Sequence, residues 1–347
     1  MGSVRYPPRS RGQPPWTRLD DEALLDLRFC DLGLRIEHSP VAAAVARLHA
    51  ELAARGLTVH PHVWFSSEWF SPDGIPGIAV PFYLAHPRLL RLERRFTREV
   101  EGGNALWLLR ILRHEAGHAI DTAYRLRQRT DWRRLFGDAK KPYPKAYTPR
   151  PGSRRYVQHL GHWYAQAHPT EDFAETFAVW LKPRSTWRRD YADWPEALRK
   201  LEYVDAVMGE VAGKRRHVHS RAFVEPLASE RSSLRQHYAH MQKLHRFGRV
   251  TRVDRILERA FTRDPEAERG ASSLLRAFGV HACHGMAVEA ECSTYVVQQV
   301  IRAAIKRCER LDLRVRGGSR AARHRLRRLL VRLARLTARA PGRRVIM

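Results

Sequence analysis

The stretch that decides the fold is NALWLLRILRHEAGHAIDTAYRLR, residues 104–127. Asn104 is a residue type that caps helix N-termini, and it precedes an apolar series at helical spacing. That series is Leu106, Leu109, Ile111, Leu112, Ile120 and Tyr124. We therefore expect one long helix from Asn104 to about Arg127.

Two histidines of this helix stand four residues apart, so His114 and His118 lie on one face and can bind one metal ion. Glu115 lies one step round the helix, where it can act as general base for a metal-activated water without being a ligand. Zn²⁺ suits this pattern, because it lowers the pKa of a bound water toward ~7 and polarises a carbonyl. The five-residue pattern also occurs by chance in unrelated helices, so further residues have to support it.

The motif also contains the small residues Ala116 and Gly117. A glycine inside a helix costs about 1 kcal/mol relative to alanine. We therefore expect Gly117 to allow another backbone to pack closely or to give access to a cleft.

A second helix is predicted to begin at Pro169 and to end before Pro183. Glu171 and Glu175 stand four residues apart on one face of it. One glutamate could ligate zinc while the other braces a ligand histidine.

These two helices resemble those of the glutamate-zincins, and more closely those of the putative zinc-binding metallopeptidases of bacteria. The catalytic domain of anthrax lethal factor carries similar motifs, a His-Glu-Phe-Gly-His helix and a Glu-Phe-Phe-Ala-Glu helix. The resemblance covers roughly residues 57–212. It rests on His114-Glu115-Ala116-Gly117-His118-Ala119-Ile120-Asp121, Trp132, Phe136-Gly137, Trp163-Tyr164-Ala165-Gln166 and residues 171–180.

The resemblance implies a zincin-like fold and peptidase activity, with Glu171 as third zinc ligand and Glu175 as the acid that braces a ligand. It also implies that Tyr164 donates a hydrogen bond to the oxyanion of the tetrahedral intermediate, because it stands seven residues before Glu171. An ordinary packed aromatic side chain is the alternative for Tyr164.

Other polar residues near the two helices leave alternatives open. Asp121 could orient a ligand, or it could make a helix-end or surface contact. His159, His162 and His168 could each be a rival third ligand, a substrate contact or a solvated loop residue. The resemblance favours Glu171 as the ligand.

The remaining pattern predicts an α+β domain, with a small mixed sheet packed on the active-site helix. Residues 57–66 and 77–85 predict paired strands separated by a turn at 71–74. Pro81 fits an edge strand that could bind an extended peptide by strand addition, and an internal hairpin is the alternative. Helices are expected from Val41 to Gly56 and over 194–211, with an irregular region over 131–156.

Positive charge is concentrated in the C-terminal part of the chain. Of a formal net charge of +27, residues 213–347 carry +20, from 31 Lys and Arg against 11 Asp and Glu. Such a region would attract nucleic acid, an anionic membrane surface or an acidic protein.

A basic amphipathic helix is predicted in this region, with an apolar stripe at Leu326, Leu329, Leu330, Leu333 and Leu336. It could contact nucleic acid or membrane, dock to an acidic partner, or pack against its own domain. The cluster His281-Ala282-Cys283-His284, with Cys292 beyond it, fits no standard zinc spacing, so we expect a helix-end or core group.

The chain is predicted to be cytoplasmic. Four scattered cysteines without a C-x-x-C pair favour free thiols, and no apolar run is long enough for a transmembrane segment. We divide the chain into a flexible Pro- and Arg-rich leader (1–19), a zincin-like catalytic domain (20–212) and a basic, mainly helical region (213–347).

The sequence thus predicts a zinc metallopeptidase that acts on a peptide or protein substrate, with Glu115 as general base. The rival is a catalytically silent zinc-binding protein whose basic region binds nucleic acid or an acidic partner. The intact Glu115 argues against this rival, because a protein without turnover has no evident need for an acid beside the metal.

Overall fold

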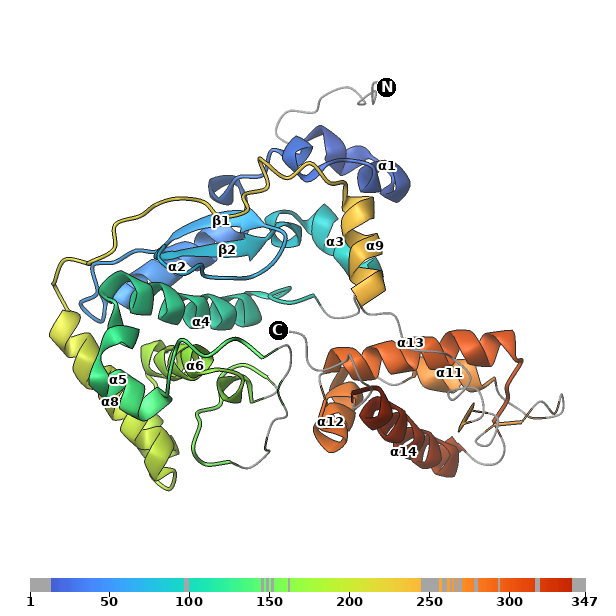
Figure 1. Ribbon diagram of the computed structural model, residues 1–347. Coiled ribbons are helices and arrows are strands. Elements are labelled where there is room, and N and C mark those ends of the chain that lie inside the picture. Colours follow the sequence, from blue (N-terminus) through green and yellow to red (C-terminus); the bar gives the residue numbers. More distant parts are fainter. Residues whose placement is uncertain are drawn as a thin grey trace. The chain divides into compact units, whose positions relative to one another are not determined.

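The computed structural model describes residues 14–96, 100–144, 147, 150, 153–161 and 163–244, together with 256–257, 261–262, 264, 267, 270–277, 280–292, 294–315 and 319–338. These residues fall into two compact units (Figure 1). The first is drawn from Met1–Lys141 and Ser153–His245, and the second from Pro142–Gly152 and Arg246–Met347. The predicted division at residues 19 and 212 stays a prediction.

The first unit consists mainly of helices around a short sheet, which agrees with the predicted α+β class. Its elements are α1 (Asp21–Leu25), α2 (Val41–Ala53), β1 (His62–Ser66), β2 (Gly77–Pro81), α3 (Pro87–Phe96), α4 (Ala105–Tyr124), α5 (Thr130–Phe136), α6 (Pro169–Leu181), α7 (Trp187–Asp190), α8 (Pro195–Val211) and α9 (Leu234–Leu244).

The strands β1 and β2 pair in parallel, with His62 opposite Gly77 and Ser66 opposite Pro81. The predicted pairing is confirmed, but the hairpin alternative is wrong, because a hairpin joins antiparallel strands. Phe70 adds one antiparallel bridge to Ala79, whose amide donates to the Phe70 carbonyl at 2.8 Å. The described sheet is therefore mixed only at this bridge, and Phe70 covers the outer edge of β2 there.

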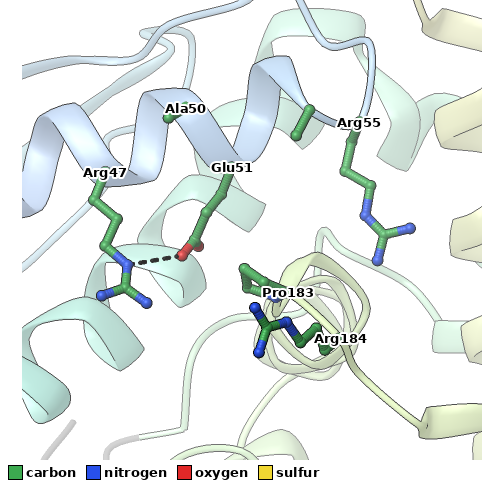
Figure 2. Close-up of a pocket in the computed structure, with 7 residues that line it drawn as sticks. Arg47, Ala50, Glu51, Arg55, Pro183 and Arg184 are labelled. Atoms are coloured by element: carbon green, nitrogen blue, oxygen red, sulfur yellow. Dashed lines mark hydrogen bonds and ion pairs between the residues drawn. The ribbon is translucent and has the colours of Figure 1, made fainter.

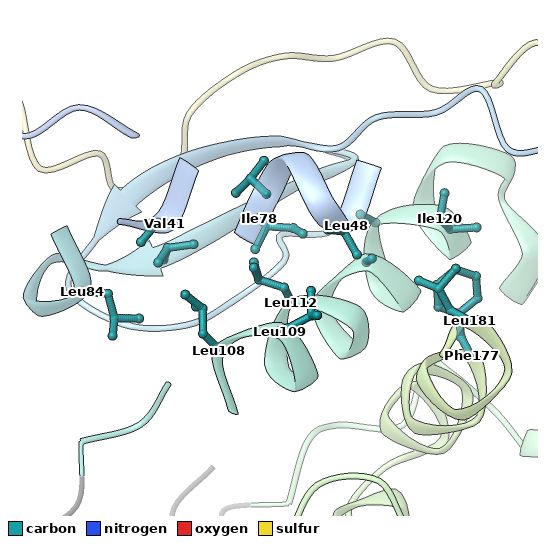
Figure 3. Close-up of a cluster of buried hydrophobic side chains, with 14 of the residues drawn as sticks. Val41, Leu48, Ile78, Leu84, Leu108, Leu109, Leu112, Ile120, Phe177 and Leu181 are labelled. Atoms are coloured by element: carbon teal, nitrogen blue, oxygen red, sulfur yellow. The ribbon is translucent and has the colours of Figure 1, made fainter. Parts of the chain in front are cut away.

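Helix α4 lies between two layers, with the sheet and α2 on one side and α6 on the other (Figures 1 and 3). The side chains between these layers are apolar and buried. They include Val41, Leu48, Ile78, Leu109, Leu112, Ile120, Phe177 and Leu181. Burial on both sides holds α4 in place along most of its length, which fixes the residues that it carries.

The strands are shorter than expected, because residues 57–61 lie outside β1 and Phe82–Ala85 form a 3₁₀ helix after β2. Two further regions differ from the sequence-based expectation. The irregular region predicted over 131–156 begins with α5, because Trp132 and Phe136 stand four residues apart and pack their rings against Phe173. The flexible leader is wrong for residues 14–18, where Trp16 is 2% exposed and donates its indole N–H to the Leu32 carbonyl at 2.9 Å. Residues 1–13 of that leader lie outside the described residues.

The second unit contains α11 (Ala271–Arg276), α12 (Val280–Ala290), α13 (Thr294–Arg310) and α14 (Ser319–Ala338). Leu326, Leu330 and Leu333 of α14 are buried in its core, whereas Leu336 is 37% exposed. Of the three alternatives for the basic helix, this burial agrees with the one in which the helix packs against its own domain. A contact with a polyanion stays a prediction.

The cysteines are free thiols, as predicted. Cys283 and Cys292 are buried in the core of the second unit, which agrees with the expected core group, and among the described residues they join no candidate metal group. Burial raises the pKa of the Cys292 thiol to about 12. Within the described ranges, every helix is too short or too polar to cross a bilayer.

A buried ion pair ties α2 to α4 one residue before His114. Arg113 donates from Nε and Nη2 to the two carboxylate oxygens of Glu51, both at 2.7 Å. The Arg113 and Glu51 side chains are only 5% and 7% exposed. Because two buried charges satisfy each other here, removal of one leaves the other uncompensated.

We expect Glu51→Gln to lower the free energy of unfolding by about 3 kcal/mol, because Arg113 would remain buried without a countercharge. Chemical denaturation followed by circular dichroism measures this change. Arg47→Gln is the control, since Arg47 also contacts Glu51 but its side chain is 65% exposed; it should cost less than about 1 kcal/mol. Equal effects of the two substitutions would contradict the assigned role of the buried pair.

Candidate metal centre

Helix α4 begins at a capping asparagine and ends at a left-handed residue. Asn104 Oδ1 accepts a hydrogen bond from the Trp107 amide at 2.9 Å, which confirms the predicted N-cap. The helix ends at Tyr124, because Arg125 takes a left-handed backbone conformation with φ +54°. Between these ends, His114 and His118 lie one turn apart and their rings make an edge contact.

Helix α6 begins at Pro169, as predicted. Pro169 needs no amide partner at the first helical position, and the His168 side chain accepts a hydrogen bond from the Thr170 amide. Glu171 and Asp172 fall in the first turn, where the helix dipole favours negative charge. The start of α6 therefore places a carboxylate at the end of the helix that tolerates it best.

The two helices approach each other most closely at Gly117. A Cβ atom added there would lie 2.8 Å from Ala174 Cα and 3.2 Å from the Ala174 carbonyl oxygen. Real Cβ atoms are not found that close to backbone atoms, so only glycine fits at position 117 in this packing. This confirms the expectation that a second backbone packs against the motif.

The close approach brings three ligand-type atoms together. Glu171 Oε2 lies 3.0 Å from His114 Nε2 and 3.3 Å from His118 Nε2, and the two histidine nitrogens are 3.2 Å apart. Donor atoms on a tetrahedral zinc ion are about 3.3 Å from one another. The buried group of His114, His118 and Glu171 could therefore hold a metal ion.

Glu175 holds the ligand His114 through its other ring nitrogen, Nδ1. Its Oε1 lies 2.9 Å from His114 Nδ1, and its Oε2 accepts from the Leu160 amide at 2.8 Å and from the His159 amide at 3.3 Å. This arrangement fixes the ring orientation of His114 and directs Nε2 toward His118 and Glu171. Glu175 is fully buried, so its position is set by these contacts.

The charges of the group support one another. Burial disfavours the charged forms of His114 and Glu171, but the hydrogen bonds and attraction between them outweigh it. The pKa of His114 is consequently raised well above its usual value, and the pKa of Glu171 is lowered well below its usual range. A metal ion bound here would take the place of the proton on His114, because a histidine ligand has to be a neutral imidazole.

Glu115 lies beside this group without joining it. Its side chain is 7% exposed, and its Oε2 is buried with no hydrogen-bond partner among the described residues. The backbone carbonyl of Glu115 accepts from Ser71 Oγ at 3.1 Å, so the segment next to Phe70 is tied to α4 at this point. A buried carboxylate oxygen without a protein partner is available to a water or a substrate.

Tyr164 lies on the His114 side of the group. It begins the short 3₁₀ helix Tyr164–Gln166, and its ring centroid is 5.4 Å from that of His114. The sequence-based expectation that Tyr164 lies near the ligands is therefore consistent with its position.

The rival ligands lie elsewhere. His159 Nε2 bonds the Arg110 carbonyl at 2.9 Å, and burial lowers the pKa of His159 to about 4. His168 bonds Thr170 Oγ1 and the Lys141 carbonyl. Neither belongs to the candidate metal group, and His162 lies outside the described residues.

Asp121 makes the helix-end contact rather than a contact with a ligand. Its carboxylate accepts from the Arg127 amide at 2.7 Å and from Arg127 Nε at 2.6 Å. Among the described residues, no hydrogen bond joins Asp121 to His114 or His118. The physical reason is that the chain turns back at Arg125, which brings Arg127 to the buried carboxylate.

A buried pair beside Glu171 was not anticipated from the sequence. Lys200 Nζ lies 2.6 Å from Asp172 Oδ2 and 2.9 Å from the Arg155 carbonyl oxygen. Burial raises the pKa of Asp172 to about 7, although Lys200 opposes the shift. The signal in the sequence is a lysine at an inward position of α8, adjacent to Leu201 and four residues before Val204.

Residues 94–206 match the model of a family described as putative zinc-binding metallo-peptidase. The matched range begins in α3, ends in α8 and contains every member of the candidate metal group. Searches of curated proteins and of solved structures found no match. The family match confirms the resemblance noted in the sequence, and it agrees with zinc as the cofactor.

We expect Gly117→Ala to lower the melting temperature and to weaken zinc binding, because the new methyl group forces α4 away from Ala174. Gly209→Ala is the matched control: Gly209 lies inside α8 with nothing within 4 Å of an added Cβ. That control should be neutral or stabilising by up to about 1 kcal/mol. Thermal unfolding and metal titration measure both variants, and similar behaviour of the two would refute the close-packing argument.

Proposed function

We propose that this chain, whose residues 94–206 match the zinc-binding metallo-peptidase family, is a zinc-dependent peptidase with a zincin-like catalytic domain. The observation that carries the proposal is a buried His-His-Glu group beside a carboxylate oxygen of Glu115 that has no partner among the described residues. The ligand group alone would suit a structural site as well. Glu115 adds the acid that hydrolysis requires.

The residues present fit a zinc ion. His114, His118 and Glu171 supply two imidazole nitrogens and one carboxylate oxygen at mutual distances of 3.0–3.3 Å. Three protein ligands leave a fourth position for water or substrate, which distinguishes catalytic from structural zinc sites. Bound there, zinc would supply Lewis acidity, lowering the pKa of a water molecule and polarising a carbonyl group.

Glu115 is the proposed proton carrier. Its buried Oε2 accepts a proton from the attacking water and then delivers it to the leaving amine of the peptide. The oxygen suits this task because no described side chain or amide competes for it. The anchoring of the Glu115 carbonyl by Ser71 keeps this part of the helix in place.

Tyr164 and Glu175 complete the proposed machinery. The Tyr164 phenol donates a hydrogen bond to the oxyanion that forms on the scissile carbonyl. Glu175 holds His114 through Nδ1, so that Nε2 faces the metal position. Asp121 is assigned to the helix end and not to the ligands, because Arg127 engages its carboxylate.

The rival function is a zinc-binding protein without turnover that uses its basic C-terminal region on a polyanion. Both functions require the metal, so zinc content alone does not separate them. Peptide hydrolysis that depends on Glu115 separates them, because the rival has no use for this carboxylate. The peptide substrate and a cytoplasmic location stay predictions.

We expect the purified chain to contain one zinc ion, measured by inductively coupled plasma mass spectrometry. Glu115→Gln should keep this zinc and lose peptide hydrolysis by about 10²- to 10⁴-fold, since proton transfer is removed while the ligands stay. His118→Ala should lose the metal. Glu202→Gln, an exposed change on α8, is the control and should keep both properties. Absence of zinc, or full activity in Glu115→Gln, would refute the proposed function.

Tyr164→Phe separates the two alternatives for Tyr164. If the phenol stabilises the oxyanion, kcat should fall about 10²- to 10³-fold with little change in KM. If the ring only packs, phenylalanine preserves the packing and kcat stays unchanged. Tyr203→Phe is the control, because it removes a hydroxyl that donates to Asp131, which is not one of the proposed ligands. Steady-state kinetics on a peptide substrate measure both.

A further inference from the structure

The first unit contains a pocket separate from the metal centre. Its volume is about 500 Å³, within the range of small-molecule sites. It lies between α2 and the turn that follows α6 (Figure 2). The lining residues are Arg47, Ala50, Glu51, Ala54, Arg55, Pro183 and Arg184.

None of the three proposed ligands lines the pocket, although Glu51 pairs with Arg113, the residue before His114. Arg184 follows α6, and Glu171 lies in the first turn of that helix. Leu181 lies ten positions after Glu171 on this helix, which corresponds to roughly 15 Å at 1.5 Å per residue. A molecule in the pocket therefore does not occupy the metal position.

The lining carries a net positive charge. Arg47, Arg55 and Arg184 contribute three guanidinium groups, against the carboxylate of Glu51. That carboxylate is already held by Arg113 through two bonds of 2.7 Å. Arg113 neutralises Glu51, although Arg47 Nε also lies 3.3 Å from Glu51 Oε1. Arg55 and Arg184 have no carboxylate among the lining residues to offset them, so the lining keeps a net positive charge.

Arg55 is held in place before any ligand arrives. Its Nη2 donates to the Trp180 carbonyl at 2.7 Å, and its guanidinium carbon lies 4.6 Å from the centroid of the Trp180 ring. This cation–π contact and the hydrogen bond use only part of the guanidinium's donor capacity. A preorganised arginine loses less conformational freedom when it binds a ligand.

Arg184 has a backbone conformation that arginine rarely adopts. The Ser185 amide donates to the Lys182 carbonyl at 3.1 Å, which closes a tight turn with Pro183 second and Arg184 third. Arg184 has φ +55°, and glycine or asparagine is the usual residue at such a position. The turn itself therefore does not account for an arginine there.

We propose that this pocket binds an oxyanion, namely the phosphate or carboxylate group of a small molecule. Planar guanidinium groups match both groups through paired hydrogen bonds. Three of them around one concavity of ligand size, with the opposing carboxylate neutralised by Arg113, select for negative charge. The site does not depend on the proposed peptidase activity.

Isothermal titration calorimetry on the full chain tests the site. Inorganic phosphate and citrate are the probes, with chloride at equal ionic strength as reference. The chain is titrated with its metal in place, and the substitution Arg184→Asn distinguishes binding in the pocket from binding at the metal. We expect one saturable site per chain for phosphate, citrate or both, and the probe that binds more tightly identifies the source of the oxyanion.

Arg184→Asn should weaken this binding about tenfold, as expected for loss of a charge-assisted hydrogen bond, and should keep the fold because asparagine accepts a positive φ. Arg189→Gln removes the same charge from an exposed arginine outside the pocket, whose side chain is 79% exposed, and should leave the Kd unchanged. Equal weakening in both variants would show a general charge effect and overturn the proposal. So would the lack of a saturable site for both probes.

Discussion

The structure depends on one constraint, the close approach of α4 and α6 at Gly117 and Ala174. The histidines come from one helix and the glutamate from the other, so their separation is set by the distance between the two backbones. Any side chain larger than hydrogen at position 117 would increase the distance between the two backbones. The cost of a glycine inside a helix is thus offset by a contact that brings Glu171 within 3.3 Å of His118.

The charged residues around the two helices follow one rule: each deeply buried charge has a partner on another segment. Arg113 meets Glu51, Asp121 meets Arg127, and Asp172 meets Lys200. These pairs link α4 and α6 to α2, to the turn after α4 and to α8. Glu115 departs from the rule: Asp172 also has one buried oxygen without a described partner, but its other oxygen pairs with Lys200, whereas Glu115 has no ion pair among the described residues. This departure fits the role of proton carrier that we propose for Glu115.

Much of the candidate site could be predicted from the sequence, because it resides in helices whose periodicity, caps and four-residue spacings are local properties. Asn104, Pro169 and the glutamates of α6 are examples. What escaped prediction depends on contacts distant along the chain. The parallel direction of β1 and β2, the burial of Trp16 and the Lys200–Asp172 pair each require a partner that no local pattern specifies. Asp121 shows the same limit, since its spacing allowed two partners and the left-handed turn at Arg125 selected Arg127.

The candidate ligands His118 on α4 and Glu171 on α6 are 53 positions apart in the sequence. An ion held by both helices acts as a cross-link that closes this loop. A covalent link over a loop of that size would restrict the unfolded chain by about 4 kcal/mol. The metal would then contribute to the lifetime of the folded protein as well as to its chemistry, so that a chain deprived of zinc would also become more easily degraded.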